Sequence, residues 1–413
     1  MLFKIMEVIH YLILKNAKII DCKTDNLNIY QGTLIIKDKR VKRILANIQE
    51  SVDEDNAQVI DLKGKYLLPG LIDSHVHLAI NGNRNPWHQL NEEKRIQFER
   101  ALQNAKKSLK NGITMLRDLG DNKDVIWSLR NYFENNNNND VGPDIKLSGN
   151  WLTKKGGHGS QVGYVVDKNS NYLKIITKKK AKNINILKII LTEGLASETK
   201  KKNQFSLSEL KNIVQVAHKE GFSVSAHVQT YIGAKIAVQA NIDSIEHGIF
   251  LDKYLVKSIK EKGIYLVPTL SGPYFIKERG HDFGLTNKLV KKVKKIWPKI
   301  KESFRLALEN NVKIIMGSDA STPGNLHGNN LSELVLMTKL GMSPYQSLLS
   351  ATRNAAEMLG EEENFGTIEE GKYADLVVFK ENPLININLI RRPEMVIKKG
   401  RIVYGYKKED CFW

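Results

Sequence analysis

An alternation of strand-like and helix-like segments runs through the middle of this chain of 413 residues and restricts its fold more than any other feature. Alternating strands and amphipathic helices are typical of parallel βα units. Eight such units predict an α/β fold, a closed (β/α)8 TIM-like barrel whose chemistry lies at the carboxyl ends of the strands. The eight predicted strands are Leu71–Leu78, Ile113–Asp118, Asp144–Gly149, Ile184–Ile190, Phe222–His227, Ile242–His247, Ile264–Thr269 and Val312–Asp319.

The two ends of the chain have a different pattern. Short segments rich in Ile, Leu and Val, with turn residues between them, predict β-strands outside the alternating region. They are Tyr11–Cys22, Gly32–Lys37, Val41–Ala46, Asp375–Phe379, Met395–Lys398 and Arg401–Tyr406. We therefore expect two structural units, as the chain length also suggests at roughly 150 residues per domain.

Composition narrows the class of protein. Apolar residues make up 41% of the chain and charged residues 26%, values that are ordinary for a globular protein. The net charge of +18 would suit a nucleic-acid partner. The basic excess is mostly Lys in short clusters, however, without the interleaved aromatic residues of a base-stacking surface. We therefore predict no nucleic-acid partner.

Two further observations concern the cellular compartment. The two cysteines, Cys22 and Cys411, lie far apart in the sequence, which excludes a disulfide framework and favours a reducing compartment. The segment Met1–Leu14 is apolar, but charged residues interrupt it. Its longest apolar stretch is too short for a membrane span, and no signal-peptide cleavage site follows. We expect a cytoplasmic protein without a membrane partner.

Six residues of metal-binding type fall late in the predicted strands. Side chains alternate between the two faces of a strand, so His75 and His77 of the first strand point the same way. Imidazole is a common ligand of zinc, and a barrel brings its strand ends to one rim. The six predicted ligands are His75, His77, Lys188, His227, His247 and Asp319.

Lys188 permits two interpretations, because it lies in the apolar run Ile186–Ile190, where a charged ammonium is costly. In one, the ammonium extends to the surface. In the other, burial lowers the lysine pKa, and the neutral amine adds carbon dioxide to form an anionic carbamate. The carbamate would then bridge two divalent cations, one held by His75, His77 and Asp319 and the other by His227 and His247.

Such a site could hydrolyse an amide. Two ions would lower the pKa of a shared water and polarise a substrate carbonyl. Asp319 would take the proton of the attacking hydroxide and pass it to the leaving amine, unless it is only a turn or N-cap residue. His158, in the glycine-rich stretch 156–159, would hydrogen-bond the substrate, unless it is an incidental loop residue. Glu246 is expected on the strand face opposite to His247, as a support of the barrel.

Several motifs resemble those of the amidohydrolase superfamily, and the similarity extends from about residue 11 to residue 405. The motifs are Leu68–Leu78, Gly112–Asp118, Ile245–Gly248, Gly317–Asp319, Ala351–Ala356 and Gly366–Leu376. The chain is most similar to the imidazolonepropionase-related, prolidase-like branch. The resemblance implies a distorted barrel over residues 67–365 and a small β-sandwich built from residues 1–66 and 366–413.

The resemblance also implies an activity. In binuclear members of this branch a carboxylated lysine bridges two metal ions, the role that Lys188 would have, and a loop histidine like His158 binds substrate. The implied reaction is hydrolysis of a dipeptide, Xaa-Pro or another, or of an N-acyl amino acid by a metal-bridging hydroxide. Zinc is expected, although manganese and cobalt suit the same ligands. The alternatives are a cyclic-amide or lactone hydrolase, with one metal ion, and an inactive scaffold that has kept the barrel. The presence of every candidate ligand argues against the scaffold.

One position departs from the family pattern. Two residues after the fifth-strand histidine the family often has His or Tyr, whereas this chain has Gln229. Tyr231 is then a candidate, together with Gln229, for contact with the carbonyl or carboxylate of a small-molecule substrate. The sequence does not decide between a monomer and a homo-oligomer.

Overall fold

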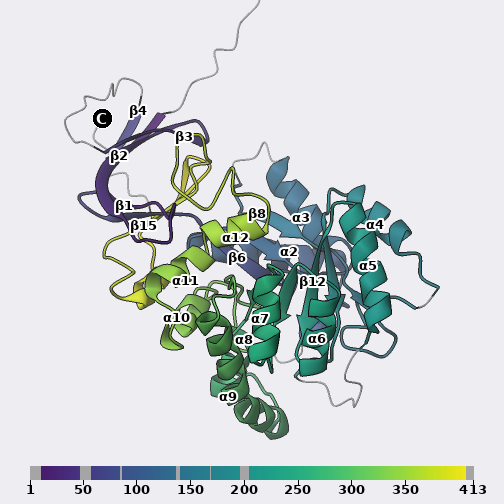
Figure 1. Ribbon diagram of the computed structural model, residues 1–413. Coiled ribbons are helices and arrows are strands. Elements are labelled where there is room, and N and C mark those ends of the chain that lie inside the picture. The colour runs from purple at the N-terminus through teal and green to yellow at the C-terminus, as the bar shows by residue number, and fades with distance from the viewer. Residues whose placement is uncertain are drawn as a thin grey trace, which may run out of the picture. The chain divides into compact units, whose positions relative to one another are not determined.

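The computed structural model describes most of the chain, and Figure 1 shows its helices and strands. The described residues are 11–46, 57–83, 86–135, 140–167, 169–195 and 204–405, without the side chain of Trp87. They divide into two compact units. The terminal unit takes its described residues from 1–71, 110–114 and 344–413, and the central unit from 72–109 and 115–343. Much of Met1–Leu14, and Cys411, lie outside the described residues.

One eight-stranded sheet dominates the terminal unit and contains strands from both ends of the chain. The N-terminal strands are β1 (Tyr11–Ile20), β2 (Ile29–Lys37), β3 (Arg40–Leu45), β4 (Ala57–Asp61) and β5 (Tyr66–Pro69). The C-terminal strands are β15 (Leu376–Phe379), β16 (Met395–Lys398) and β17 (Arg401–Tyr404). The helices are α11 (Pro344–Ser350), α12 (Arg353–Met358) and the 3-10 helix η1 (Ile387–Arg391). The predicted strands at both ends are thus present.

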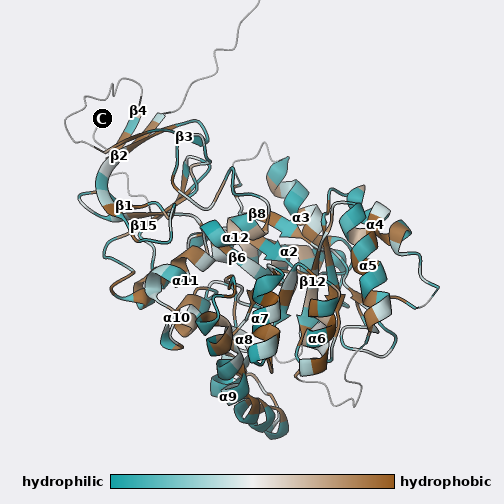
Figure 2. Ribbon diagram, in the orientation of Figure 1, coloured by the Kyte–Doolittle hydropathy of each residue, from teal (hydrophilic) through white to brown (hydrophobic). Residues whose placement is uncertain are grey.

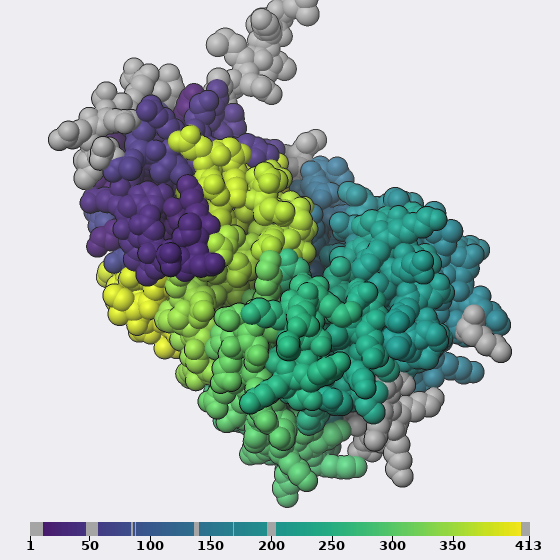
Figure 3. All heavy atoms as spheres, in the orientation of Figure 1, coloured from purple at the N-terminus to yellow at the C-terminus, as the bar shows by residue number. Residues whose placement is uncertain are grey.

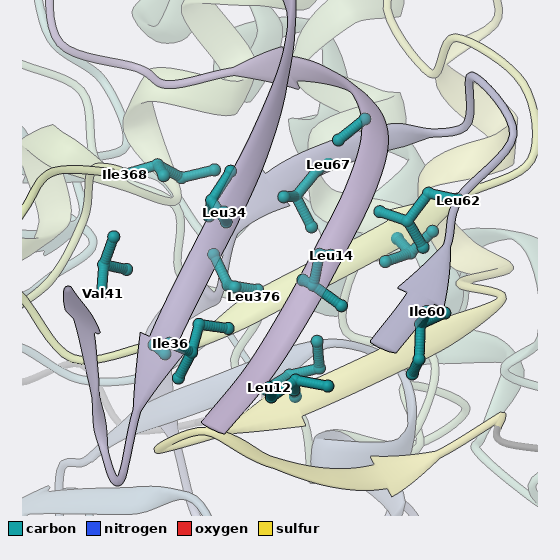
Figure 4. Packing of buried hydrophobic residues seen from close by; sticks show 14 of the residues in the cluster. Leu12, Leu14, Leu34, Ile36, Val41, Ile60, Leu62, Leu67, Ile368 and Leu376 are labelled. Atoms are coloured by element: carbon teal, nitrogen blue, oxygen red, sulfur yellow. The ribbon is translucent and has the colours of Figure 1, made fainter. Parts of the chain in front are cut away.

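The two ends are joined by hydrogen bonds between strands. β5 pairs with β15 in antiparallel fashion, and Leu67 lies opposite Val378. Figure 3 shows the N-terminal segments, in purple, next to the C-terminal segments, in yellow. Leu34, Leu67 and Leu376, from β2, β5 and β15, belong to one buried cluster (Figure 4). Alternation of side chains along each strand places these residues on the same inner face.

The central unit alternates strands and helices. The strands are β6 (Leu71–Val76), β7 (Ile113–Asp118), β8 (Asp144–Leu147), β9 (Leu152–Thr153), β10 (Tyr164–Val165), β11 (Ile186–Ile190), β12 (Ser223–Val228), β13 (Ser244–His247) and β14 (Tyr265–Val267). The helices are α1 (Pro86–Gln89), α2 (Lys94–Lys110), α3 (Val125–Glu134), α4 (Tyr172–Lys180), α5 (Leu207–Lys219), α6 (Tyr231–Gln239), α7 (Lys253–Glu261), α8 (Ser271–Arg279), α9 (Asn287–Glu309) and α10 (Ser332–Lys339).

Local sequence explains why these helices form. Ser206 begins α5 in a capping box with Glu209, so two backbone N–H groups at the helix start are satisfied. Leu210, Ile213 and Ala217 then recur at helical spacing and are buried. In Figure 2, α5 carries both hydrophobic residues, in brown, and hydrophilic residues, in teal. Within the described part of the chain, no helix is both long and apolar enough to cross a membrane.

Neighbouring strands of the central unit run parallel. They are ordered β6–β7–β8 in one sheet and β10–β9–β11–β12–β13–β14 in another. The segment that follows α9 forms backbone hydrogen bonds with a strand on each side. Leu266 N of β14 donates to Lys313 O at 3.0 Å, and Asp319 N donates to His75 O of β6 at 2.8 Å. This segment therefore links β14 to β6.

Some predicted strands are shorter than expected. The eighth, Val312–Asp319, forms no regular strand, and isolated bridges at Ile314 and Ala320 replace it. Asp319 has a φ of 52°, outside the extended region, so the ladder cannot continue through it. Thr269, with a φ of 48°, likewise lies beyond the end of β14. The short strands β4, β5, β9 and β10 were not predicted.

Candidate active site

All six predicted ligands line one cavity of about 280 Å³ in the central unit. Each lies at or just beyond the carboxyl end of a strand or in the segment that follows α9, apart from Lys188 in the middle of β11. Parallel neighbouring strands end on the same side, so their last side chains meet. His158 and Gln229 line the same cavity.

His75, His77 and Asp319 form one half of the candidate site. The Asp319 carboxylate oxygen Oδ1 lies 3.6 Å from His75 Nε2 and 3.7 Å from His77 Nε2. These distances are too long for hydrogen bonds and close to the roughly 3.4 Å between two ligand atoms that share one zinc ion. Ligand atoms of His75, His247 and Asp319 also lie within 4.8 Å of one another. This part of the cavity therefore fits a divalent cation.

Hydrogen bonds fix which nitrogen of each ring faces that point. His75 Nδ1 donates to Glu246 Oε2 at 2.6 Å, and His77 Nδ1 donates to the Gly120 carbonyl at 3.1 Å. A carboxylate and a carbonyl can only accept, so both rings carry their proton on Nδ1. The unprotonated Nε2 atoms are left for a metal ion. Burial lowers the pKa of His75 to about 4 and that of His77 to about 3, so both rings are neutral.

Glu246 corrects one sequence prediction. It was expected on the strand face opposite to His247, as a support; it does act as a support, but its carboxylate contacts His75, one of the predicted ligands, on the side of the site. His247 has a φ of 70°, in the left-handed region, which breaks the regular alternation of a strand. Glu246 is completely buried and accepts hydrogen bonds from Arg117 and His75 at 2.8 and 2.6 Å. Burial would raise its pKa, but Arg117, Lys188 and His75 lower the pKa well below its usual value. Glu246 therefore orients His75 as a carboxylate.

His227 and His247 form the other half of the site. His247 Nε2 lies 2.8 Å from His227 Nδ1, and His247 Nδ1 lies 2.6 Å from the Thr269 hydroxyl. Burial lowers the pKa of both histidines well below the usual value. His227 Nε2 is buried and has no hydrogen-bond partner within the described ranges. Two neutral imidazoles at this distance can share one N–H···N hydrogen bond, or turn unprotonated nitrogens toward a cation.

Lys188 is buried in the cavity, with 2% of its surface exposed. The interpretation in which its ammonium extends to the surface is therefore wrong. Burial lowers the pKa of Lys188 to about 8, although Glu246 and Asp319 oppose this shift. Among the residues that the structure describes, the Nζ atom has no hydrogen-bond partner. An unpartnered buried amine is costly, so the donor set fits a lysine that is modified or binds another group.

Asp319 is held by a buried residue that the sequence analysis missed. Asp73 Oδ1 accepts hydrogen bonds from the backbone N–H groups of Ser318 and His75, at 2.9 and 3.2 Å. One carboxylate thereby fixes the residues next to Asp319 and β6 together. Burial raises the pKa of Asp319 to about 7, and Lys188 opposes the shift. Asp319 can therefore exchange a proton near neutral pH.

His158 and Gln229 complete the cavity wall. The His158 ring lies 4.9 Å from the His227 ring, measured between centroids, and burial lowers its pKa to about 4. A Cβ atom at Gly194 would lie 2.8 Å from His158 Cε1, so the glycine leaves room for this ring. Gln229 Oε1 is buried without a hydrogen-bond partner in the described residues. Both side chains are therefore placed to contact a ligand.

Tyr231 corrects another prediction. It begins α6, is 40% exposed, and does not belong to the described lining of the cavity. A hydrogen bond with Asp252 raises the pKa of its hydroxyl. The turn that starts the helix directs this side chain to the surface. Trp151, in contrast, was not predicted, but it lines the cavity with its ring 6.0 Å from that of His77.

Comparison with known proteins gives the family. Residues 66–403 match the sequence model of the amidohydrolase family. Ochratoxinase of Aspergillus niger is 27% identical over 377 residues, which cover 82% of this chain and 76% of the relative. Imidazolonepropionase of Treponema denticola is 23% identical and covers 91% of this chain and 94% of its own length.

Solved structures of similar proteins agree with the sequence comparison. A Xaa-Pro dipeptidase, solved with methionine bound in its active site, is similar with a TM-score of 0.85 and 29% identity, over 96% of this chain and 100% of that chain. These likenesses imply a TIM-barrel-like domain and an enzyme that hydrolyses carbon–nitrogen bonds of small molecules. The family is generally metal-dependent, which agrees with the group of His75, His247 and Asp319. The chain belongs to the amidohydrolase family.

Proposed function

We propose that this protein hydrolyses the amide bond of a dipeptide or of an N-acyl amino acid. The observation that carries the proposal is the meeting of six ligand-type side chains and His158 around one cavity. The similar Xaa-Pro dipeptidase supports this substrate class. A prolidase solved with N-methylphosphonate-L-proline, 29% identical with a TM-score of 0.85, supports it as well.

The proposal includes the domain boundaries expected from the sequence. A closed (β/α)8 barrel of residues 67–365 would carry the site, and residues 1–66 and 366–413 would form a sandwich-like domain. The bonds that link β14 and β6 through residues 313–319 support closure of the barrel. The single sheet shared by both chain ends supports the composite second domain.

Two divalent ions, zinc in the first instance, would bind in the cavity. His75, His77 and Asp319 would hold one, and His227 and His247 the other. Lys188 would bridge them after carboxylation by carbon dioxide, and its lowered pKa and unpartnered Nζ support this modification. When bound, such ions lower the pKa of a water molecule and polarise the substrate carbonyl.

The remaining steps belong to the side chains of the protein. Asp319 would accept a proton from the attacking water and donate it to the leaving nitrogen. His158, neutral because of burial, would hydrogen-bond the carbonyl or carboxylate of the substrate. Gln229 has an unpartnered amide oxygen in the same cavity and would contact a substrate N–H.

A second candidate is hydrolysis of a cyclic amide. The imidazolonepropionase relative, which aligns over nearly its whole length, favours it. Both candidates use the same ligands and differ in the shape of the substrate. Assay of the zinc-loaded protein against dipeptides, N-acyl amino acids and cyclic amides decides between them, and hydrolysis of the cyclic amides alone would contradict our proposal.

Other expectations are part of the same proposal. The substrate would be a small molecule, and the protein would be cytoplasmic with no nucleic-acid partner. Titration with oligonucleotides tests the last point, because a nucleic-acid-binding protein would bind them with a steep dependence on salt. Size-exclusion chromatography decides between a monomer and a homo-oligomer.

A further inference from the structure

Four apolar side chains from α8, α9 and the segment between them form one wall of the cavity. This apolar wall consists of Pro273, Ile276, Leu285 and Leu289. All four are only partly buried, whereas Val290 and Val293 of the same region are 1% and 0% exposed. The wall is therefore apolar surface that faces the cavity instead of the protein core.

Helical spacing explains how two of these residues share one surface. Pro273 and Ile276 are three positions apart on α8, whereas Leu285 lies just before the N-cap of α9 and Leu289 in its first turn. The spacing on α8 puts Pro273 and Ile276 on one side of that helix, and Leu285 and Leu289 line the same cavity. Leaving four apolar side chains in contact with water is unfavourable, so an apolar ligand group would gain free energy by covering them.

The wall begins next to Asp319. Gly272 precedes Pro273 and also lines the cavity. A Cβ atom at Gly272 would lie 3.5 Å from Asp319 Oδ2 and 3.2 Å from Thr322 Oγ1. The absence of a side chain at this position leaves space between the Asp319 carboxylate and the wall. If a ligand places one of its atoms next to the Asp319 carboxylate, a group bonded to that atom can therefore extend along the apolar wall.

We infer that the apolar wall binds the side chain of the amino acid that leaves as the amine. The inference rests on the proposed function, in which Asp319 donates a proton to the leaving nitrogen. That nitrogen must lie at Asp319, so the Cα atom and side chain attached to it lie beside Gly272. The acyl part then extends toward Ile190 and Leu195, which line the cavity together with Lys188 and His158. The preferred substrates carry a large apolar residue on the amine side.

A series of substrates with one constant acyl group tests the inference. The series is N-acetyl-alanine, N-acetyl-2-aminobutyrate, N-acetyl-norvaline and N-acetyl-norleucine, in which each member adds one methylene to the side chain. Burial of a methylene contributes about 0.8 kcal/mol, so kcat/KM of the zinc-loaded protein should rise about fourfold at each step. In Ile276→Asn and Leu289→Asn proteins the rise of kcat/KM along the series should be lost.

Two controls complete the experiment. Leu195→Asn, on the other side of the cavity, should keep the fourfold steps of this series. Tyr254→Asn, at a position 68% exposed on α7, should leave all rates unchanged. Zinc content and the thermal midpoint of each variant show whether the protein is folded and loaded.

The outcomes separate the inference from the proposed function. Hydrolysis of the whole series without a rise, or a rise that survives both wall substitutions, would overturn the inference and leave the amide hydrolase intact. If the folded, zinc-loaded protein hydrolyses no member of the series and no dipeptide, the proposed function fails and the inference fails with it. If kcat/KM rises along the series and only the wall substitutions remove this rise, the result supports both the inference and the proposed function.

Discussion

The core of the terminal unit and the cavity of the central unit are built on opposite principles. In the core, Leu34, Leu67 and Leu376 are apolar, at most 1% exposed, and placed by regular strand alternation. In the cavity, the Lys188 amine is buried without a hydrogen-bond partner in the described residues. Thr269, which contacts the cavity residue His247, adopts a φ of 48°, which is unfavourable for a β-branched residue. The core is arranged for stability, whereas the cavity keeps unfavourable features that a bound ligand would relieve.

The largest effect that this comparison predicts comes from Lys188→Ala. Loss of the bridging group should remove most of both zinc ions and lower kcat/KM on the order of a thousandfold, because metal chemistry supplies the nucleophile. Metal analysis after dialysis and kinetic assay measure these losses. The metal-free variant should be at least as stable as the metal-free wild type, since an unpartnered buried amine is gone. Full metal content and activity would show that Lys188 is no bridge.

Leu376→Ala should have the reverse effect. Truncation of this buried leucine leaves a cavity in the core and should lower the free energy of unfolding by about 2–5 kcal/mol. Zinc content and kcat of the folded protein should remain near wild type. Urea denaturation monitored by circular dichroism measures the free energy of unfolding, metal analysis measures the zinc content, and kinetic assay measures kcat. Loss of zinc with unchanged stability would mean that the two regions are not independent.

Glu246→Gln tests whether orientation of a ligand matters as much as its presence. The amide is close in size to the carboxylate but weakens the bond to His75 Nδ1, so zinc affinity should fall about 10- to 100-fold. Competition with a chromophoric chelator measures the affinity. Ser225→Ala removes another hydrogen bond to the same carboxylate, at 2.7 Å, and should have a smaller effect. Equal affinities for Glu246→Gln and wild type would exclude an orienting role.

Removal of zinc should reveal the cost of the histidines themselves. Burial lowers the pKa of His327 to about 4, and this ring lies beside His77. Between pH 6.5 and 4 the unfolded state therefore binds more protons at this residue than the folded state, so stability falls as the pH falls. From pH 6.5 to 5 the metal-free wild type should lose about 1.6 kcal/mol relative to a His327→Gln protein. Urea denaturation of both at each pH measures this difference. A constant difference would contradict the lowered pKa.

The sequence predicted those parts of the site that follow regular rules. Ligands at the ends of parallel strands meet because the strands run in one direction, so the positions of His227 and His247 could be anticipated. Most strands at the two ends could also be recognised from their apolar segments, but the short strands β4 and β5 could not. The union of the two ends in one sheet depends on the pairing of β5 with β15, which no local pattern specifies.

The remaining features depend on departures from those rules. His247 meets the other ligands on the side where Glu246 also lies because His247 adopts a left-handed φ, which strand alternation does not foresee. Tyr231 was expected near the substrate, but the start of α6 directs it outward. The apolar wall was not predicted, because apolar residues at helical spacing have the same pattern in a core. Only the three-dimensional structure distinguishes a core residue from one that faces a cavity.

The pairing of β5 with β15 has a consequence for biosynthesis. Leu67 and Val378 are neighbours in the sheet but lie more than 300 positions apart along the chain. A chain emerging from the ribosome exposes β5 as an unpaired edge until almost the whole protein has been translated. Such edges associate readily with other chains. Nascent or truncated forms of this enzyme that lack β15 are therefore expected to depend on chaperones and to aggregate without them.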